Sequence, residues 1–201
     1  MAKWNHDFRG VVYDEAKISE SIVLIIGPTG SGKTHLANLL TNESSLFKVV
    51  PNCTTRKARP TDSTGHFKYL DDQTFNENLK QEAFFLARKS PLPNYGYLKK
   101  DLNEVFSLGS IAVFMFRYSG LRYIHKYLKQ YCVVFIESDP ALILKHSKDS
   151  FAPPCLNDIE MNLEENRKLY KDLKSTSSCI LIKNDYAGAL LLAKEQIIQA
   201  F

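Results

Sequence analysis

The residues with the clearest chemistry are GPTGSGKT, the stretch from Gly27 to Thr34. Their spacing is G-x-x-x-x-G-K-[ST], the pattern of a loop that wraps the phosphates of a nucleotide. Glycines let backbone N–H groups approach phosphate oxygens because they have no Cβ, and the N-terminus of a following helix adds partial positive charge. Lys33 is expected to reach the β- and γ-phosphates, and the Thr34 hydroxyl is expected to ligate Mg²⁺.

We therefore predict that the chain binds a nucleoside triphosphate, and we assign the whole stretch to this site: Gly27, Pro28, Thr29, Gly30, Ser31, Gly32, Lys33 and Thr34. The alternative is a glycine-rich turn before a helix, with no ligand. It is disfavoured because an apolar strand pattern precedes the motif and a helical pattern follows it. The motif alone does not identify the reaction, since GTPases, motors, helicases and small-molecule kinases share it.

A second candidate site is the basic loop NCTTRKARP, from Asn52 to Pro60, which carries Arg56, Lys57 and Arg59. Transfer of a phosphoryl group to an acceptor that is itself anionic requires cations opposite the phosphate loop. Arginine suits this because its planar fork pairs with two phosphate oxygens. We predict that Arg56 and Arg59 hold the acceptor and act in catalysis with Lys33, although basic residues are more often solvated surface groups.

Short apolar runs that alternate with helical patterns must position these loops. The runs at Ser21–Gly27, Ser110–Phe116, Tyr131–Glu137 and Ser178–Lys183 are typical of strands buried on both faces of a parallel sheet. Helical patterns lie at Lys33–Leu40, Lys99–Ser107, Ser119–Lys129, Pro140–His146, Asp158–Leu173 and Tyr186–Ala200. This alternation predicts an α/β domain with right-handed crossovers. Two proline-rich regions interrupt it, an insert from about 51 to 97 and a loop at Lys148–Asp158.

Composition excludes several classes of protein. The 201 residues are 44% hydrophobic and 24% charged, as in an ordinary globular domain. The net charge of +4 suits phosphorylated ligands but is too small to indicate nucleic acid. No apolar run reaches the ~18 residues that span a bilayer, the charged start is not a secretory signal, and the four cysteines form no C-x-x-C pair. We expect a cytoplasmic protein with neither a membrane nor a nucleic-acid partner.

The order of these motifs resembles the guanylate kinase family of nucleoside monophosphate kinases. TTRKARP fits the family's TTR-x-x-RP in full, NYGY at Asn94–Tyr97 resembles its YYG turn, and IKND at Ile182–Asp185 resembles its late NDD-like turn. The likeness implies a three-layer P-loop NTPase with a central parallel sheet, an inserted acceptor-binding subdomain and a mobile lid. The implied division is an N-terminal extension at 1–20 and a guanylate kinase-like domain at 21–201, with the insert at about 51–97 and the lid at about 146–160.

The resemblance also implies roles for single residues. Arg56, Arg59 and Tyr95 would grip the acceptor phosphate, and Asn184 would lie beside the base of ATP. ATP and Mg²⁺ are the implied cofactors, and the implied partner is a small phosphorylated acceptor. Two simpler interpretations stay open: Tyr95 packs as an aromatic turn residue, or Asn184 caps the helix that begins near Tyr186.

The chain departs from the family where the family reads guanine. Leu86 and Arg117 stand at positions of recognition carboxylates, and Tyr97 replaces a Ser or Thr. Phe67 takes the place of a phosphate-binding Tyr, for which Tyr69 could substitute. Losing carboxylates removes the hydrogen-bond acceptors that satisfy a guanine edge, and Arg117 adds a cation to the predicted acceptor site. The lid region also lacks the family's Arg pair, and its basic residues are Lys145, His146, Lys148, Arg167 and Lys168.

The preferred interpretation is ATP-dependent phosphoryl transfer to a small phosphorylated acceptor. One alternative is the ribose 1,5-bisphosphate kinase branch, which resembles this chain in the phosphate loop and near His66, and whose second acceptor phosphate could meet Arg117. Another monophosphate nucleotide is equally open as the acceptor. A catalytically reduced nucleotide-binding or protein-interaction module is disfavoured by the intact phosphate loop. A nucleic-acid-directed ATPase is disfavoured because Arg117, not an acidic residue, follows Ser110–Phe116.

Overall fold

The computed structural model describes residues 21–60, 62–89, 93–116, 121, 124, 128–129, 131–147, 155–174, 178–184 and 188–201. The predictions for residues 1–20, for Arg117, for Lys148 and for most of the helix at Ser119–Lys129 lie outside these residues. So does much of the predicted lid, because 148–154 are not described. No helix in the described ranges combines the length and the apolar character that crossing a membrane requires.

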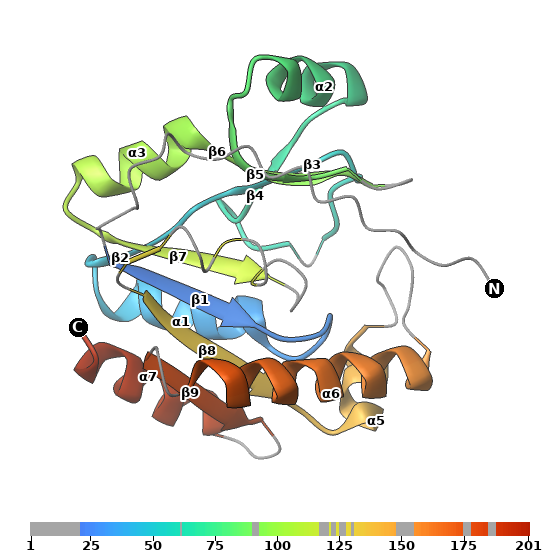
Figure 1. Cartoon of the computed structure of the whole chain (residues 1–201), viewed down its shortest axis with the longest axis vertical. Helices are drawn as coiled ribbons and strands as arrows, with labels where there is room; N and C mark the ends of the chain where they lie inside the picture. Colours follow the sequence, from blue (N-terminus) through green and yellow to red (C-terminus); the bar gives the residue numbers. More distant parts are fainter. Residues whose placement is uncertain are drawn as a thin grey trace.

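A five-stranded parallel sheet forms the centre of the molecule (Figure 1). Its strands lie in the order β2-β7-β1-β8-β9, with bounds Phe47–Val49, Ile111–Phe116, Ile22–Ile26, Tyr131–Glu137 and Ser178–Lys183. All five residues of β1 are 0% exposed, because β7 and β8 flank this strand and helices cover both faces. The predicted α/β fold is therefore confirmed, and β1, β7 and β8 are buried as predicted. The prediction of burial on both faces is wrong for β9, which lies at the edge of the sheet and leaves Leu181 36% exposed.

Helices cover the two faces of this sheet in separate layers. Helices α1 (Lys33–Glu43) and α7 (Ala189–Gln199) pack on one face around Val23 and Ile25. Helices α3 (Lys99–Ser107) and α6 (Leu156–Leu173) pack on the other face, and the short α5 (Pro140–His146) packs against α6. Each lies where a helical pattern was predicted, although α7 begins three residues later than expected, after Gly188.

The segment between β2 and α3 forms a second, four-stranded sheet. Its order is β4-β3-β6-β5, with bounds Phe67–Tyr69, Asn52–Thr54, Tyr95–Leu98 and Phe84–Arg88. Helix α2 (Asp72–Lys80) covers the outer face through Phe75, which packs on Phe84. The inner face joins the main core through Tyr97, whose hydroxyl donates to the Met115 carbonyl of β7 at 2.7 Å.

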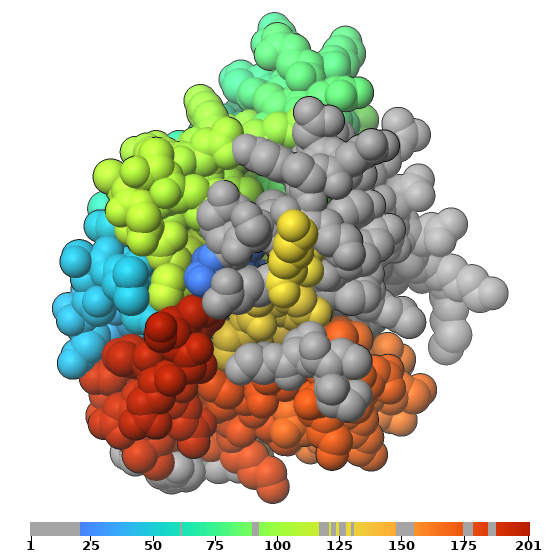
Figure 2. Space-filling view, turned by 60° about the vertical axis from the view of Figure 1, so that its left-hand side comes forward, coloured from blue at the N-terminus to red at the C-terminus, as the bar shows by residue number. Residues whose placement is uncertain are grey.

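This second sheet and α2 stand apart from the rest of the molecule in outline. In Figure 2 the green segment that includes α2 projects from one end, while α7 and α6, in red and orange, form the opposite end. Helix α3 lies toward the same end as the projecting segment. The loop that follows β1 leaves the five-stranded sheet and the loop that follows β3 leaves the four-stranded sheet, so the two loops belong to different sheets.

Candidate functional site

The phosphate loop leaves the carboxyl end of β1 and leads directly into α1. The Gly27 N–H donates to the Phe116 carbonyl at 3.3 Å, so the first residue of the loop is still held at the end of the neighbouring strand β7. Gly32 is the N-cap of α1, no side chain caps this helix within the described residues, and its first turn contains no acidic residue. The partial positive charge of the helix N-terminus is therefore not neutralised by a carboxylate, which suits an anionic ligand.

Close packing explains why glycines stand in this loop. Gly30 and Gly32 have φ values of +84° and +99°, which L side chains rarely adopt. A Cβ on Gly30 would lie 2.8 Å from the Ile143 carbonyl oxygen of α5, and a Cβ on Gly32 would lie 2.9 Å from Nδ2 of Asn184. Ser31 is buried, and its Oγ has no hydrogen-bond partner in the described part of the chain. This cradle with an unsatisfied hydroxyl fits the phosphates of a nucleotide.

Lys33 spans the phosphate loop from its C-terminal end. Its Nζ donates to the carbonyl oxygens of Gly27 at 2.9 Å and of Pro28 at 2.7 Å. These contacts hold the ammonium group on the loop itself, next to the N-terminus of α1. Thr34 follows as the second residue of α1. The structure therefore brings together the lysine, the hydroxyl and the helix N-terminus that the sequence motif predicted.

Asn184 lies against the phosphate loop, immediately after β9. Its Nδ2 donates to the Ser31 carbonyl at 3.1 Å, and its backbone N–H donates to the Glu137 carbonyl at 2.7 Å. The interpretation of Asn184 as the cap of the last helix is wrong, because the N-cap of α7 is Gly188. The side chain instead holds the loop in place, and its contact with a base stays a prediction.

An ion pair beside the loop was not anticipated from the sequence. Glu137, at the end of β8, is 6% exposed and accepts hydrogen bonds from Nε and Nη2 of Arg167 on α6 at 2.7 and 3.3 Å. The hydrogen bond to Glu137 raises the pKa of Arg167. A signal was present, since an acidic residue that ends a buried apolar strand needs a partner. The pair ties α6, whose first turn lies within the predicted lid, to the edge of the nucleotide site.

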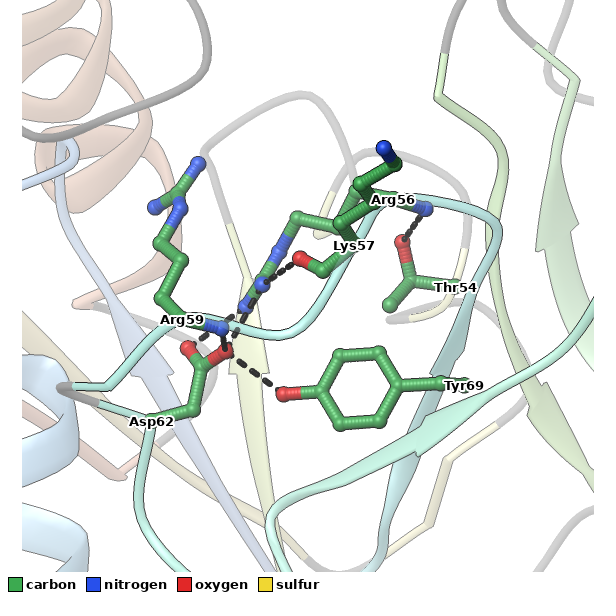
Figure 3. Close-up of polar contacts among 6 residues, drawn as sticks. All are labelled: Thr54, Arg56, Lys57, Arg59, Asp62 and Tyr69. Atoms are coloured by element: carbon green, nitrogen blue, oxygen red, sulfur yellow. Dashed lines mark hydrogen bonds and ion pairs between the residues drawn. The ribbon is translucent and has the colours of Figure 1, made fainter.

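Arg56 is buried, and its guanidinium is held in one orientation by hydrogen bonds to Asp62 and to the Lys57 carbonyl (Figure 3). Its Nη1 donates to Oδ2 of Asp62 at 2.7 Å, and its Nη2 donates to Oδ1 of Asp62 at 2.7 Å. Nη1 also donates to the Lys57 carbonyl at 2.9 Å, and the guanidinium stacks 4.5 Å from the centre of the Phe67 ring. Because the Arg56 side chain is only 4% exposed, its interpretation as a solvated surface cation is wrong.

Asp62 organises the basic loop, and sequence reasoning missed it. Besides Arg56, its carboxylate accepts the Tyr69 hydroxyl at 2.5 Å and the Arg59 backbone N–H at 2.7 Å. Burial alone would raise the pKa of Asp62, but the hydrogen bonds from Arg56, Tyr69 and Arg59 lower it to about 2. Burial alone would lower the pKa of Arg56, but the hydrogen bond to Asp62 and its negative charge raise it above the usual value. An acidic residue shortly after three cations was the available signal.

The other predicted acceptor residues lie around this cluster. In Figure 3 the Arg59 side chain points away from Asp62, and its guanidinium makes no hydrogen bond or ion pair with the residues that the structure describes. Tyr95 faces Thr54 across the β3–β6 pair and is near enough to Arg56 to contribute to raising its pKa. The structure thus brings Arg56, Arg59 and Tyr95 to one end of the second sheet, while Arg117 lies outside the described residues.

Leu86 and Tyr97, at the predicted base-reading positions, are both buried in the core. They face each other across the β5–β6 pair and are 6% and 2% exposed. The Tyr97 ring packs edge-on at 4.9 and 5.1 Å from the rings of Phe114 and Phe116, and burial raises the pKa of its hydroxyl. This part of the inner face is apolar, and the Tyr97 hydroxyl is occupied by Met115 and Asn52.

Comparisons with known proteins agree on one family. The family model described as Guanylate kinase matches residues 19–197. The chain is 30% identical over 117 residues to a guanylate kinase of Oleidesulfovibrio alaskensis and 25% identical over 126 residues to one of Helicobacter pylori. These matches cover 57% and 62% of this chain and 56% and 61% of the relatives, so the chain spans less than two thirds of their length.

A solved structure supports the fold. The crystal structure of guanylate kinase from Anaplasma phagocytophilum superposes with a TM-score of 0.62 at 14% identity, over 92% of this chain and 86% of that chain. At this identity the likeness establishes the architecture alone. It confirms the expected P-loop NTPase fold with a central parallel sheet.

Proposed function

Because this chain belongs to the guanylate kinase family, we propose that it transfers the γ-phosphoryl group of ATP to the phosphate of a small acceptor. The observation that supports the proposal is the presence of two clusters of different construction, each of which suits an anion. One is the backbone cradle with Lys33, and the other is the arginine cluster that Asp62 orders on the second sheet. A donor and an acceptor that both carry phosphate require two such sites.

On the donor side, the loop from Gly27 to Thr34 would hold the phosphates of ATP by backbone N–H groups and by the N-terminus of α1. Lys33 would exchange its two carbonyl contacts for the β- and γ-phosphate oxygens. Asn184 keeps the Ser31 carbonyl in place, which fixes the shape of the cradle. Bound Mg²⁺ would neutralise charge between the phosphates, and Thr34 is the residue that would hold it together with phosphate oxygens and water.

On the acceptor side, Arg56 and Arg59 would hold the acceptor phosphate, with Tyr95 beside them. Guanidinium groups remain charged at every physiological pH and offer paired donors. They would also neutralise the charge that builds up as the acceptor oxygen approaches the γ-phosphate. Arg56 is already immobilised by Asp62 and Phe67, so it loses little side-chain entropy on binding.

The acceptor is proposed to differ from a guanine nucleotide. Leu86 and Tyr97 offer no carboxylate, and they are buried among Phe114 and Phe116. A guanine edge placed there would leave its N–H donors unsatisfied, which discriminates strongly against a ligand. The apolar surroundings favour a monophosphate with another base. The alternative acceptor, a sugar phosphate such as ribose 1,5-bisphosphate, depends on Arg117, which would meet its second phosphate.

The test is a panel of acceptors with the purified chain, ATP and Mg²⁺. AMP, GMP, CMP, UMP and ribose 1,5-bisphosphate are each incubated, and ADP and the phosphorylated product are quantified. We expect turnover with at least one acceptor and a lower kcat/KM for GMP than for the best acceptor. If ATP binds and no acceptor in the panel is phosphorylated, the proposal is rejected in favour of a nucleotide-binding or protein-interaction module.

A further inference from the structure

We propose that Asp62 is a positioning residue for the acceptor, because it fixes Arg56 and Arg59 so that one free edge of the Arg56 guanidinium receives the acceptor phosphate. The inference rests on the proposed function, since it assumes that the acceptor already carries a phosphate group. It adds a residue that touches neither ligand but sets the geometry of those that do.

The hydrogen bonds of Arg56 identify the free edge. A guanidinium carries five N–H donors in one plane. Asp62 takes one from Nη1 and one from Nη2, and the Lys57 carbonyl takes the other donor of Nη1. The two that remain, on Nε and Nη2, lie side by side on a single edge. The Nε–H has no partner among the described residues, and Nε is not completely shielded from solvent. Two parallel N–H groups are the fork that suits two oxygens of one phosphate.

The aromatic residues of β4 prevent this edge from turning away. Phe67 and Tyr69 point to the same face of β4, since side chains alternate along a strand, and the Arg56 guanidinium lies 4.5 and 5.6 Å from their ring centres. The Tyr69 hydroxyl also donates to Asp62. Arg56 is therefore held along its end by the carboxylate and against its plane by two rings, and rotation out of this position breaks all of these contacts.

The same carboxylate shapes the path of Arg59. Oδ2 of Asp62 accepts the Arg59 backbone N–H at 2.7 Å, and the Asp62 N–H donates to the Arg59 carbonyl at 3.1 Å. This closed turn sends the Arg59 side chain away from Asp62 (Figure 3). A single side chain thus sets the direction of both arginines.

The negative charge of Asp62 allows its positioning role to be distinguished from a simple electrostatic effect on the acceptor. A carboxylate beside an anion site repels phosphate, so charge alone predicts that its removal strengthens acceptor binding. Positioning predicts the reverse, because an arginine that loses its bidentate partner must be ordered again each time the acceptor binds. The two accounts differ in the sign of the effect of Asp62→Asn.

The experiment measures steady-state kinetics of Asp62→Asn, Asp62→Glu and Tyr69→Phe with the best acceptor of the panel. We expect Asp62→Asn to raise the acceptor KM and lower kcat, with a combined loss of roughly 10- to 100-fold in kcat/KM and an ATP KM within twofold of the wild type. Asp62→Glu should recover part of the loss because it restores the charge, and Tyr69→Phe should lose less than Asp62→Asn.

The matched control is Asp101→Asn. Asp101 is also buried, and it pairs with Lys68 at 2.6 Å, whose side chain alternates to the other face of β4 from Phe67 and Tyr69. Asp101→Asn should therefore lower the melting temperature and leave the acceptor KM unchanged. If Asp101→Asn changes the acceptor KM as much as Asp62→Asn does, the effect is one of general stability and the inference is rejected.

Two outcomes separate this inference from the proposed function. If Asp62→Asn binds the acceptor as tightly as the wild type or more tightly, while Arg56→Ala weakens it, the transferase stands and the positioning role of Asp62 is overturned. If no acceptor turns over, calorimetric titration with inorganic phosphate decides. Phosphate binding that both Arg56→Ala and Asp62→Asn weaken supports the inference without the reaction, and binding that neither variant affects overturns it.

Discussion

The two loops that we propose as anion sites are built by opposite means. The phosphate loop uses backbone groups that consecutive residues position between β1 and α1, with glycines where α5 and Asn184 approach the chain. The basic loop uses arginine side chains, which are oriented by a carboxylate and by two aromatic rings from β4. A backbone cradle is rigid because its own strand and helix are rigid, whereas a side-chain site is only as rigid as its neighbours.

This difference teaches where each site is vulnerable. In the first loop, a substitution is harmful when it adds atoms or removes Lys33, since the backbone supplies most of the donors. In the second loop, a substitution is harmful when it removes any member of the cluster, because each side chain holds another. The following variants test that contrast, from the largest expected effect to the smallest.

Lys33→Ala should have the largest effect. It removes the cation that would reach the transferring phosphate, so we expect kcat to fall by roughly 10²- to 10³-fold or more, while circular dichroism and the melting temperature stay near those of the wild type. Lys48→Ala, which removes an exposed lysine of β2, is the control and should be neutral. Activity of Lys33→Ala within tenfold of the wild type would show that the loop does not act on the transferred group.

Arg59→Ala and Arg56→Ala should each lower kcat/KM for the acceptor, by roughly 100-fold for a lost charged contact. They should differ in stability. The Arg59 guanidinium makes no hydrogen bond or ion pair with the described residues, so its loss should leave the melting temperature nearly unchanged. Loss of Arg56 leaves the Asp62 carboxylate without its ion-pair partner and should lower the melting temperature. Equal melting temperatures for the two variants would contradict the described cluster.

Gly30→Ala compared with Gly65→Ala isolates close packing in the phosphate loop. Both glycines have positive φ, +84° and +79°, so both variants incur the same backbone cost of about 1–2 kcal/mol. Only at Gly30 would the new Cβ meet a backbone atom, the Ile143 carbonyl oxygen at 2.8 Å. We expect Gly30→Ala to be the less stable variant in urea unfolding and to raise the ATP KM, with no such rise for Gly65→Ala.

The smallest effect concerns acid stability. The pKa of Asp62 falls from 3.8 to about 2 on folding, so this group contributes stability above pH 4 that is lost as the pH falls toward 2. Asp62→Asn should be less stable than the wild type at pH 6, and the difference should shrink between pH 4 and pH 2. Melting curves at four pH values measure it, and a difference that stays constant over this window means that Asp62 is not held by Arg56.

Contacts between residues close together along the chain could be predicted from the sequence, whereas contacts between residues far apart along it could not. The strand, loop and helix from Ile22 to Glu43 follow one another, so their pattern alone predicted the cradle. The hydrogen bond from Asn184 to the Ser31 carbonyl joins residues 153 positions apart. The sequence suggested a base contact or a helix cap for Asn184, and this support of the loop was not predicted. The ion pair between Glu137 of β8 and Arg167 of α6 joins residues 30 positions apart, and no local pattern specifies that contact.

By itself, the sequence determined the α/β architecture and the place of the phosphate loop, because hydrophobic periodicity and glycine spacing act over neighbouring residues. It also pointed to the arginines of the basic loop. Only the tertiary structure decided that Asp62 orders them, and that Tyr97 is buried with its hydroxyl on Met115. Side-chain orientation depends on which partners the folded chain brings within hydrogen-bond distance, and those partners come from other strands and loops.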